Sequence, residues 1–300
     1  MPDLPSLGLR TGALDLPDGR QLGWTEHGPT DGAPVLYLHG GNDCGLELGW
    51  FADTLAPGLR VIAPDRPGFG DSTHQVGRRL LDLVPDVERL LDHLGVDRLP
   101  VIGLSGGGPH ALALAAGSRR ISAVAAVASP CPLVGVRLRG LWFPIRLAYA
   151  LARHAPDWLL VRFQRAMNDA ERNMAYAERM PAPDAALLRE DPSRKQRVIA
   201  SVTRAHAQGY AGAAHEWRLY VREWGFEPSA IAVPTMLWYG DADPMAPAWM
   251  GRRLAAEIPG AQLQVLDGEA HLSIIHRHAR RMIDALLARA ADDGVRLAVK

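Results

Sequence analysis

Cysteines and long apolar runs are scarce in this sequence. Only two cysteines, Cys44 and Cys131, occur among 300 residues, too few for a disulfide framework and without the spacing of metal ligands. No uninterrupted apolar segment reaches the roughly 18 residues that a transmembrane helix requires. The first residues carry acids and prolines where a signal peptide needs a basic end and an apolar stretch. We therefore expect a soluble, cytoplasmic protein with no metal and no membrane partner.

The chain also has no net charge. Thirty-three basic residues balance thirty-three acidic residues, so the composition gives no electrostatic reason to expect nucleic acid or an anionic membrane as a partner. A hydrophobic content of 48% over 300 residues is enough for one large domain or two smaller ones. We expect a small molecule as the partner, and the sequence alone leaves the oligomeric state open.

Short apolar runs alternate with longer helical patterns along most of the chain. The runs, rich in β-branched residues, cover residues 34–40, 59–65, 99–105, 121–129, 234–241 and 261–268. The helical patterns cover residues 80–95, 108–117, 246–258 and 271–290. This alternation predicts an α/β fold, a mostly parallel sheet flanked by helices on both faces. Residues 13–28 predict an opening hairpin that turns at Pro17, Asp18 and Gly19, which brings the expected sheet to eight strands.

The alternation stops between residues 131 and 233. These roughly 100 residues carry helical patterns without a convincing strand and are too many for a plain connection. We interpret them as a helical insert in a core domain formed by residues 1–130 and 234–300. The first part of the insert is amphipathic and contains many aromatic residues and arginines. Most of its aromatic side chains are expected to pack onto the core domain and a minority to line a pocket, whereas the arginines suit solvated helix faces as well as a substrate carboxylate.

Ser105 lies at the junction between a predicted strand and a predicted helix, in "VIGLSGGGPHALALAA". A serine on such a sharp turn has strained backbone angles, so only small residues are tolerated two positions away, here Gly103 and Gly107. The turn lifts the hydroxyl above the carboxyl edge of the sheet, where open α/β folds bind ligands. This context is that of a nucleophile elbow.

A serine hydroxyl is a poor nucleophile and needs a base, which in turn needs an orienting acid. His271 follows a predicted strand directly at the start of the last helix and is our candidate base. The acid is expected after another strand, where "YGDADP" supplies Asp243 as first choice and Asp241 as alternative, the latter better suited to capping the turn. The remaining histidines weighed for this role are better interpreted as structural: His110, His154, His206, His215, His276 and His278.

Acyl transfer also needs hydrogen-bond donors for the developing oxyanion. The backbone amide of Gly106, directly after Ser105, lies at a helix start, and the loop "HGGNDCG" offers the amide of Gly41. His39 is expected to hold that loop by a hydrogen bond.

Taken together, these residues resemble the α/β-hydrolase fold superfamily. The resemblance rests on the chain order Ser105, Asp243, His271, the "HGG" loop at 39–41, the "DRPGFGDS" loop at 65–72 and the elbow "GLSGG" at 103–107. It implies that the insert at 131–233 is a cap that covers the pocket and selects substrates. Serine at the elbow, where relatives that open epoxides or remove halide have aspartate, argues against both of those reactions. "HGGN" in place of "HGGG" differs from the hormone-sensitive-lipase branch, and alanine precedes His271 where many relatives have glycine.

The resulting hypothesis is a serine hydrolase that needs no cofactor and cleaves a carboxylic ester or lactone of a small, apolar molecule through an acyl-enzyme. Two rivals stay open: a C–C bond hydrolase or lyase on the same scaffold, and a ligand-binding receptor with a near-silent triad. The candidate substrate contacts are Asn42, Trp142, Phe143 and Tyr149.

Overall fold

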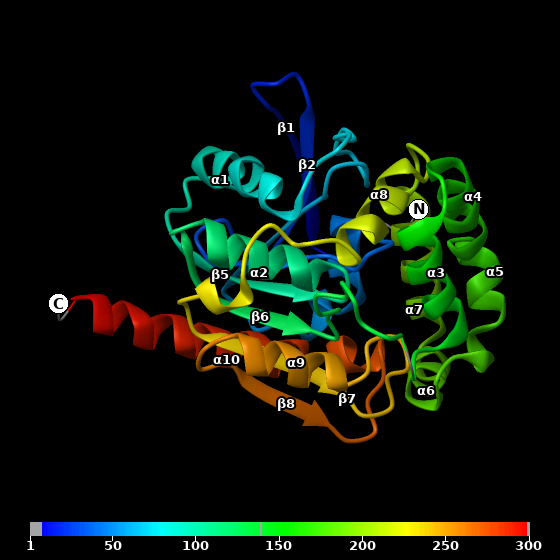
Figure 1. The fold of residues 1–300 in the computed structure, drawn as a ribbon. Coiled ribbons are helices and arrows are strands. Elements are labelled where there is room, and N and C mark those ends of the chain that lie inside the picture. Colours follow the sequence, from blue (N-terminus) through cyan, green and yellow to red (C-terminus); the bar gives the residue numbers. More distant parts are fainter. Residues whose placement is uncertain (1–7, 139, 299–300) are drawn as a thin grey trace.

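The computed structural model describes residues 8–138 and 140–298, with side chains up to residue 291 (Figure 1). Eight strands form one sheet in the order β1-β2-β4-β3-β5-β6-β7-β8. The pairs β1–β2 and β2–β4 are antiparallel, and all other neighbours are parallel. The strands are β1 Leu9–Asp15, β2 Gln21–His27, β3 Ala33–Leu38, β4 Leu59–Pro64, β5 Leu99–Leu104, β6 Ile121–Val127, β7 Thr235–Gly240 and β8 Gln262–Leu266. The predicted mostly parallel eight-stranded sheet is confirmed.

The residues of the turn between β1 and β2 explain why these two strands form a hairpin. Gly19 adopts a φ of +84°, which a residue with a side chain rarely adopts, and its amide donates to the Leu16 carbonyl at 3.0 Å. The amide of Leu16 donates to the Arg20 carbonyl at 2.7 Å. These bonds close the turn between β1 and β2, so the first two strands form the antiparallel edge of the sheet.

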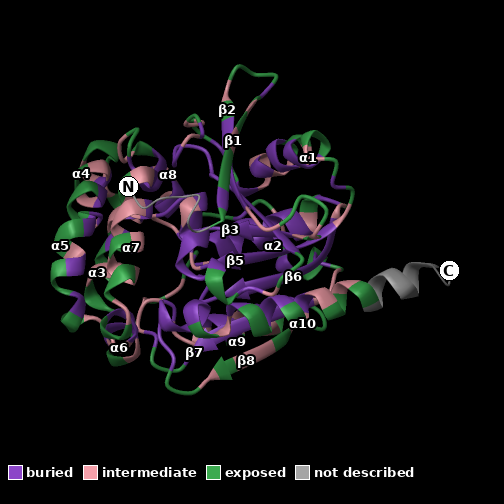
Figure 2. Cartoon of the chain, turned by 180° about the vertical axis from the view of Figure 1, so that it is seen from behind, coloured by how far each residue is buried: buried purple, intermediate pink, exposed green. Residues whose placement is uncertain are grey.

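Helices cover both faces of the sheet (Figures 1 and 2). Strands β4, β5 and β6 are buried along their whole length, as expected for strands with helices on either side. Helix α2 and helix α10 both pack on β5 and β6. The α-helices of the core domain are α1 Leu83–His93, α2 Gly107–Gly117, α9 Trp249–Glu257 and α10 Ser273–Ala298, and its 3-10 helices are η2 Gly45–Trp50, η3 Ala52–Thr54 and η4 Leu80–Asp82. A further 3-10 helix, η6 Pro228–Ala230, lies just before β7, near the end of the predicted insert, and packs on α2 and α9.

The predicted insert is helical in the structure. Its elements follow β6 and precede β7, and Figure 1 shows them gathered at one end of the sheet, as one group beside it. They are α3 Phe143–His154, α4 Asp157–Met167, α5 Ala170–Ala175, η5 Ala177–Arg179, α6 Ala182–Glu190, α7 Pro192–Ala205 and α8 Ala211–Tyr220. We refer to residues 131–233 as the cap. Its boundaries as a separate domain stay a prediction.

Within residues 8–138 and 140–298, none of the helices combines the length and the apolar character needed to cross a bilayer. The same part of the chain holds no group of three or more His, Cys, Asp or Glu side chains arranged to bind a metal ion.

Candidate active site

Ser105 occupies a strained turn between β5 and α2. Its φ is +49°, and its amide donates to the Val127 carbonyl of β6 at 2.7 Å. Only glycine fits at the two positions that flank the turn, Gly103 and Gly107. A Cβ on Gly103 would lie 2.4 Å from the Gly107 carbonyl oxygen, and a Cβ on Gly107 would lie 2.2 Å from the Leu38 carbonyl oxygen. Backbone strain of this kind persists where the surrounding structure holds it, and it occurs often at active sites.

The structure brings His271 between Ser105 and Asp243. The Nε2 atom of His271 lies 2.9 Å from Ser105 Oγ, and its Nδ1 atom lies 2.7 Å from Asp243 Oδ2. The other Asp243 oxygen accepts from the amides of Met245 and Ala246 at 2.8 and 3.1 Å, which fixes the carboxylate. Asp241, the alternative acid, instead accepts from the Gly268 amide at 2.7 Å and so bridges two loops. The geometry therefore favours Asp243 as the partner of His271.

The pKa of His271 lies above its ordinary value of 6.5. Burial alone would lower this pKa, but the charge of Asp243 and its hydrogen bond outweigh burial and stabilise the protonated ring. An imidazole stabilised in this way is a stronger base.

Asp184, from cap helix α6, fixes the segment that carries His271. Its Oδ1 atom accepts from the amides of Leu272 and Ser273 at 3.0 and 2.8 Å, and so it serves as a capping acceptor for α10 from another part of the chain. Burial raises the pKa of this carboxyl. Asp184 was not among the predicted site residues, because "PAPDAALL" contains no local signal for a contact with residues 272 and 273.

Gly41 and Gly106, the predicted oxyanion donors, lie against each other beside Ser105. A Cβ on Gly106 would lie 2.6 Å from Gly41 Cα and 2.9 Å from Gly41 N, so Gly106 has no room for a larger residue without rearrangement, whereas a Cβ on Gly41 would meet its nearest atom, Tyr220 Oη, at 3.4 Å. Among the described residues, no hydrogen bond from either amide is found, and both residues line the central cavity.

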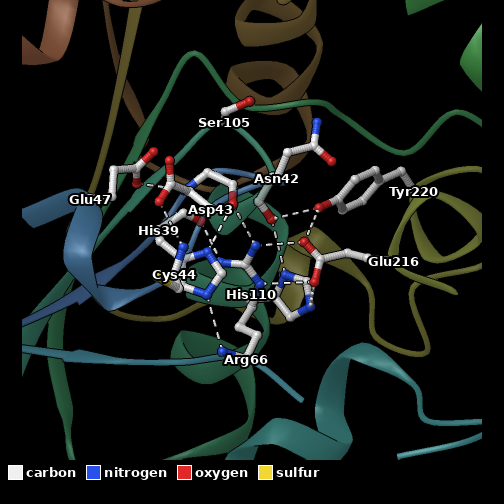
Figure 3. A network of polar contacts seen from close by, with 12 residues as sticks. His39, Asn42, Asp43, Cys44, Glu47, Arg66, Ser105, His110, Glu216 and Tyr220 are labelled. Atoms are coloured by element: carbon white, nitrogen blue, oxygen red, sulfur yellow. Dashed lines mark hydrogen bonds and ion pairs between the residues drawn. The ribbon is translucent and has the colours of Figure 1, made fainter. Parts of the chain in front are cut away.

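A fully buried ionic network holds the carbonyl groups around these amides (Figure 3). Arg66 donates to the carbonyl oxygens of His39 and Gly40, the latter at 2.9 Å. In a trans peptide the C=O and N–H bonds point in opposite directions. Since Arg66 holds the Gly40 carbonyl, it also fixes the direction of the Gly41 N–H.

The cap completes this network through Glu216 and Tyr220 of α8. Glu216 accepts from Arg66 Nη2 at 2.6 Å and from Arg78 Nη2 at 2.9 Å. Tyr220 Oη contacts Glu216 at 2.5 Å and the Gly106 carbonyl at 3.1 Å. Burial would raise the pKa of Glu216, but the charges of its cationic neighbours keep it below its usual value, so Glu216 is an anion. Tyr220, which Glu216 holds, thus reaches the backbone of Gly106.

A cavity of about 200 Å³ opens at Ser105 between the sheet edge and the cap. Its wall is mostly apolar, with Ile145, Met174, Met180, Val198, Val202 and Leu272 among its lining residues. Two carboxyl groups, Asp43 and Glu47, also line it. Glu47 Oε2 accepts from Tyr37 Oη at 2.6 Å and from the Gly40 amide at 2.7 Å, and burial raises the pKa of Glu47 to about 7.

The four predicted substrate contacts divide into two pairs. Asn42 and Tyr149 line the cavity. Trp142 and Phe143 do not, and their side chains are 42% and 62% exposed. On α3 the residues that line the cavity are Ile145 and Tyr149, whereas Phe143 and Leu147 are exposed, so Trp142 and Phe143 as substrate contacts stay a prediction. Helical spacing alone cannot tell which face of an amphipathic helix covers a cavity when aromatic residues occur on both faces.

Known proteins share this architecture. A family model described as alpha/beta hydrolase fold matches residues 33–277. The magnesium-chelatase 30 kDa subunit of Rhodobacter capsulatus is 30% identical over 255 residues, which cover 80% of this chain and 81% of that protein. A proline iminopeptidase of Xanthomonas citri is 40% identical over 110 residues; the match covers 35% of this chain and 34% of that protein, about a third of its length.

Among solved structures, the enol-lactonase from Burkholderia xenovorans LB400 superposes with a TM-score of 0.68 at 24% identity, covering 93% of this chain and all of that one. A likeness at this identity supports the fold. Together with the family match over residues 33–277, it shows that the chain belongs to the α/β-hydrolase fold family.

Proposed function

We propose that this protein is a serine hydrolase that cleaves a carboxylic ester or lactone of a small, apolar molecule. The observation that carries the proposal is the row of contacts from Ser105 Oγ through His271 to Asp243, at 2.9 and 2.7 Å, at the mouth of a mostly apolar cavity. A hydroxyl, a base and an orienting carboxylate in this order are the parts that acyl transfer requires.

The first half of the reaction forms an acyl-enzyme. His271 Nε2 takes the proton of Ser105 while the serine oxygen attacks the carbonyl carbon of the substrate. The amides of Gly41 and Gly106 donate to the oxygen that becomes negative, and the Asp243 carboxylate stabilises the imidazolium. The tetrahedral intermediate then collapses, and His271 returns the proton to the departing alcohol.

The second half releases the acid. A water molecule transfers its proton to His271 and attacks the acyl carbon, and the same two amides hold the second oxyanion. Ser105 leaves as the alcohol with the proton from His271. For a lactone, the alcohol and the acid are two ends of one product.

The proposal is tested by labelling and by product analysis. A fluorophosphonate probe should modify Ser105, and a panel of alkyl and aryl esters, lactones and thioesters should give carboxylic acid products. Absence of labelling at Ser105 would point to a receptor with a silent site. Products without a carboxylic acid would point to a lyase.

A substrate that carries an ammonium group is the second candidate. The carboxyl groups of Asp43 and Glu47 line the cavity. Burial raises the pKa of both groups, and a bound ammonium group would favour their charged forms and be stabilised by them. The similarity to a proline iminopeptidase over 110 residues makes a prolyl amide the natural comparison. Faster cleavage of L-proline 4-nitroanilide than of any neutral ester would favour this candidate, and Glu47→Gln should then remove the preference.

We expect kcat/KM to fall as the pH is lowered through the pKa of His271. Because that pKa lies above 6.5, the base form is lost on the acid side, and the midpoint should lie above pH 6.5. Glu47→Gln should move the midpoint down, since the Glu47 charge helps to raise the pKa of His271. A pH profile of kcat/KM for a neutral ester measures both midpoints. A midpoint below 6.5 in the parent enzyme would contradict the expectation.

Tyr220→Phe should lower kcat by roughly tenfold with little change in KM. The substitution removes the hydroxyl that donates to Glu216 and lies 3.1 Å from the Gly106 carbonyl oxygen. The Glu216–Arg66 network that orients the Gly41 N–H then has one partner fewer, which loosens an oxyanion donor that matters only in the transition state. Steady-state kinetics with Tyr210→Phe as the control measure the effect. A rise in KM at constant kcat would indicate a contact with the ground-state substrate instead.

A further inference from the structure

The outer surface of the cap concentrates exposed apolar side chains. Of the eight large apolar side chains that are exposed in the described part of the chain, five lie in a short segment around α3 and the start of α4. They are Val134, Trp142, Phe143, Leu147 and Trp158. Trp158 and Phe143 are 68% and 62% exposed, so most of each residue's surface contacts solvent. Single exposed apolar residues are ordinary, whereas a group of them marks an interaction surface.

The same segment is strongly basic although the whole chain is neutral. Residues 134–166 contain six arginines and one acidic residue, Asp157. Asp157 is paired with Arg218 of α8 at 2.6 Å. Arg146, Arg162 and Arg165 are exposed, and the Arg146 guanidinium lies 5.5 Å from the centre of the Phe143 ring. The balanced total charge therefore hides a local excess of positive charge on the cap.

Helical geometry places these residues on the outside of the cap. On α4, Trp158, Arg162 and Arg165 follow at spacings of four and three and so share one face. On α3, Phe143, Arg146 and Leu147 are exposed. Both helices pack against α8 with their other sides and also contact each other, and Figures 1 and 2 show α4 at the outer border of the cap. We call Trp142, Phe143, Arg146, Leu147, Trp158, Arg162 and Arg165 the basic aromatic face.

We propose, in place of the expectation of no membrane partner, that the basic aromatic face docks the enzyme on a membrane surface that contains anionic lipids. Helices that lie in a bilayer interface combine Trp, Phe and Leu with arginine, and anionic headgroups complement the excess of positive charge. A bilayer accounts for both properties, because its headgroups pair with the guanidinium groups while the acyl boundary takes up the rings. The docking does not depend on the proposed hydrolysis.

Helix α3 connects this surface with the cavity. Its outward residues belong to the basic aromatic face, while Ile145 and Tyr149 line the cavity at Ser105. A docked enzyme would hold its apolar cavity next to the bilayer, so esters that partition into lipid become the substrate class that docking favours.

Co-sedimentation with sucrose-loaded vesicles tests the proposal on the full chain. We expect the parent protein to bind vesicles of phosphatidylcholine with about one third phosphatidylglycerol far better than pure phosphatidylcholine, and to lose binding at high salt. The triple variant Arg146→Gln, Arg162→Gln, Arg165→Gln should bind the anionic vesicles roughly a hundredfold more weakly. Phe143→Ser combined with Trp158→Ser should weaken binding by about tenfold or more.

Matched controls separate docking from general changes. Val76→Ser with Val265→Ser removes exposed apolar residues elsewhere, and Arg79→Gln with Arg280→Gln removes exposed arginines elsewhere; both should bind like the parent. Ser105→Ala should also bind like the parent, so a failure of the hydrolase proposal and a failure of docking are distinguishable.

Three results would overturn the proposal. The first is equal, weak binding of the parent to both kinds of vesicle. The second is tight binding to a single-stranded oligonucleotide, but not to vesicles, with the same dependence on the three arginines. The third is a parent dimer that Phe143→Ser with Trp158→Ser converts to a monomer in analytical ultracentrifugation, which would make the face an interface between two copies.

Discussion

Ser105→Ala should reduce kcat/KM for an ester substrate by a factor of about 10³ or more, because only the oxyanion donors and substrate binding remain. The substitution removes the oxygen that His271 Nε2 contacts at 2.9 Å and leaves the backbone bond from the Ser105 amide to Val127 in place. The strained turn should survive, since Ala128 in the same protein adopts a similar φ of +47°. Steady-state kinetics and thermal unfolding together measure this result.

Ser129→Ala provides the matched control for this variant. Ser129 is buried near the end of the neighbouring strand β6, and its hydroxyl donates to the Pro130 carbonyl at 2.8 Å. The control should retain the activity of the parent and its labelling by the fluorophosphonate probe. Parent-like ester hydrolysis by Ser105→Ala would show that another group carries the reaction.

The sequence predicts those features that local patterns encode. Apolar runs rich in β-branched residues mark the parallel strands because both faces of such strands are buried. The carboxyl ends of parallel strands meet at one edge of the sheet, so residues that follow three different strands are expected close together. Ser105, Asp243 and His271 follow β5, β7 and β8, and the contacts among them agree with that expectation.

Contacts between the cap and the core domain could not be predicted from the sequence, for a physical reason. Glu216 and Arg66 are 150 positions apart in the chain, and nothing in the residues around either of them depends on the other. The same holds for Asp184 and the amides of Leu272 and Ser273. Pairings of this kind are decided by how helices pack, which spacing within one helix does not determine.

These contacts assign the cap a larger role than covering the cavity. Asp184 holds the backbone next to His271, and Glu216 holds Arg66, which donates to the Gly40 carbonyl and so fixes the Gly41 N–H. Both the proposed base and one proposed oxyanion donor, Gly41, are therefore positioned partly by cap residues. A substitution that loosens the packing of α6 or α8 should then lower kcat even where it touches no substrate.

The clearest test of the acid is a comparison of Asp243→Asn with Asp241→Asn. Asp243→Asn should lower kcat by roughly 10³ to 10⁴, because an amide can donate to His271 Nδ1 and so favour the tautomer whose Nε2 carries the proton and cannot accept one from Ser105. The asparagine oxygen can still accept from the amides of Met245 and Ala246, which Asp243 holds at 2.8 and 3.1 Å. The loop should therefore keep its shape, and thermal unfolding checks this.

Asp241→Asn should change kcat little, because Asp241 contacts the Gly268 amide at 2.7 Å and an asparagine oxygen can still accept that bond. The two variants change the same chemical group two positions apart on one loop, so a difference between them measures the contact with His271 rather than the loss of a charge near the site. Equal losses in both would mean that the negative charge of the loop matters more than the orientation of the imidazole. A large loss confined to Asp241→Asn would move the role of the acid to that residue.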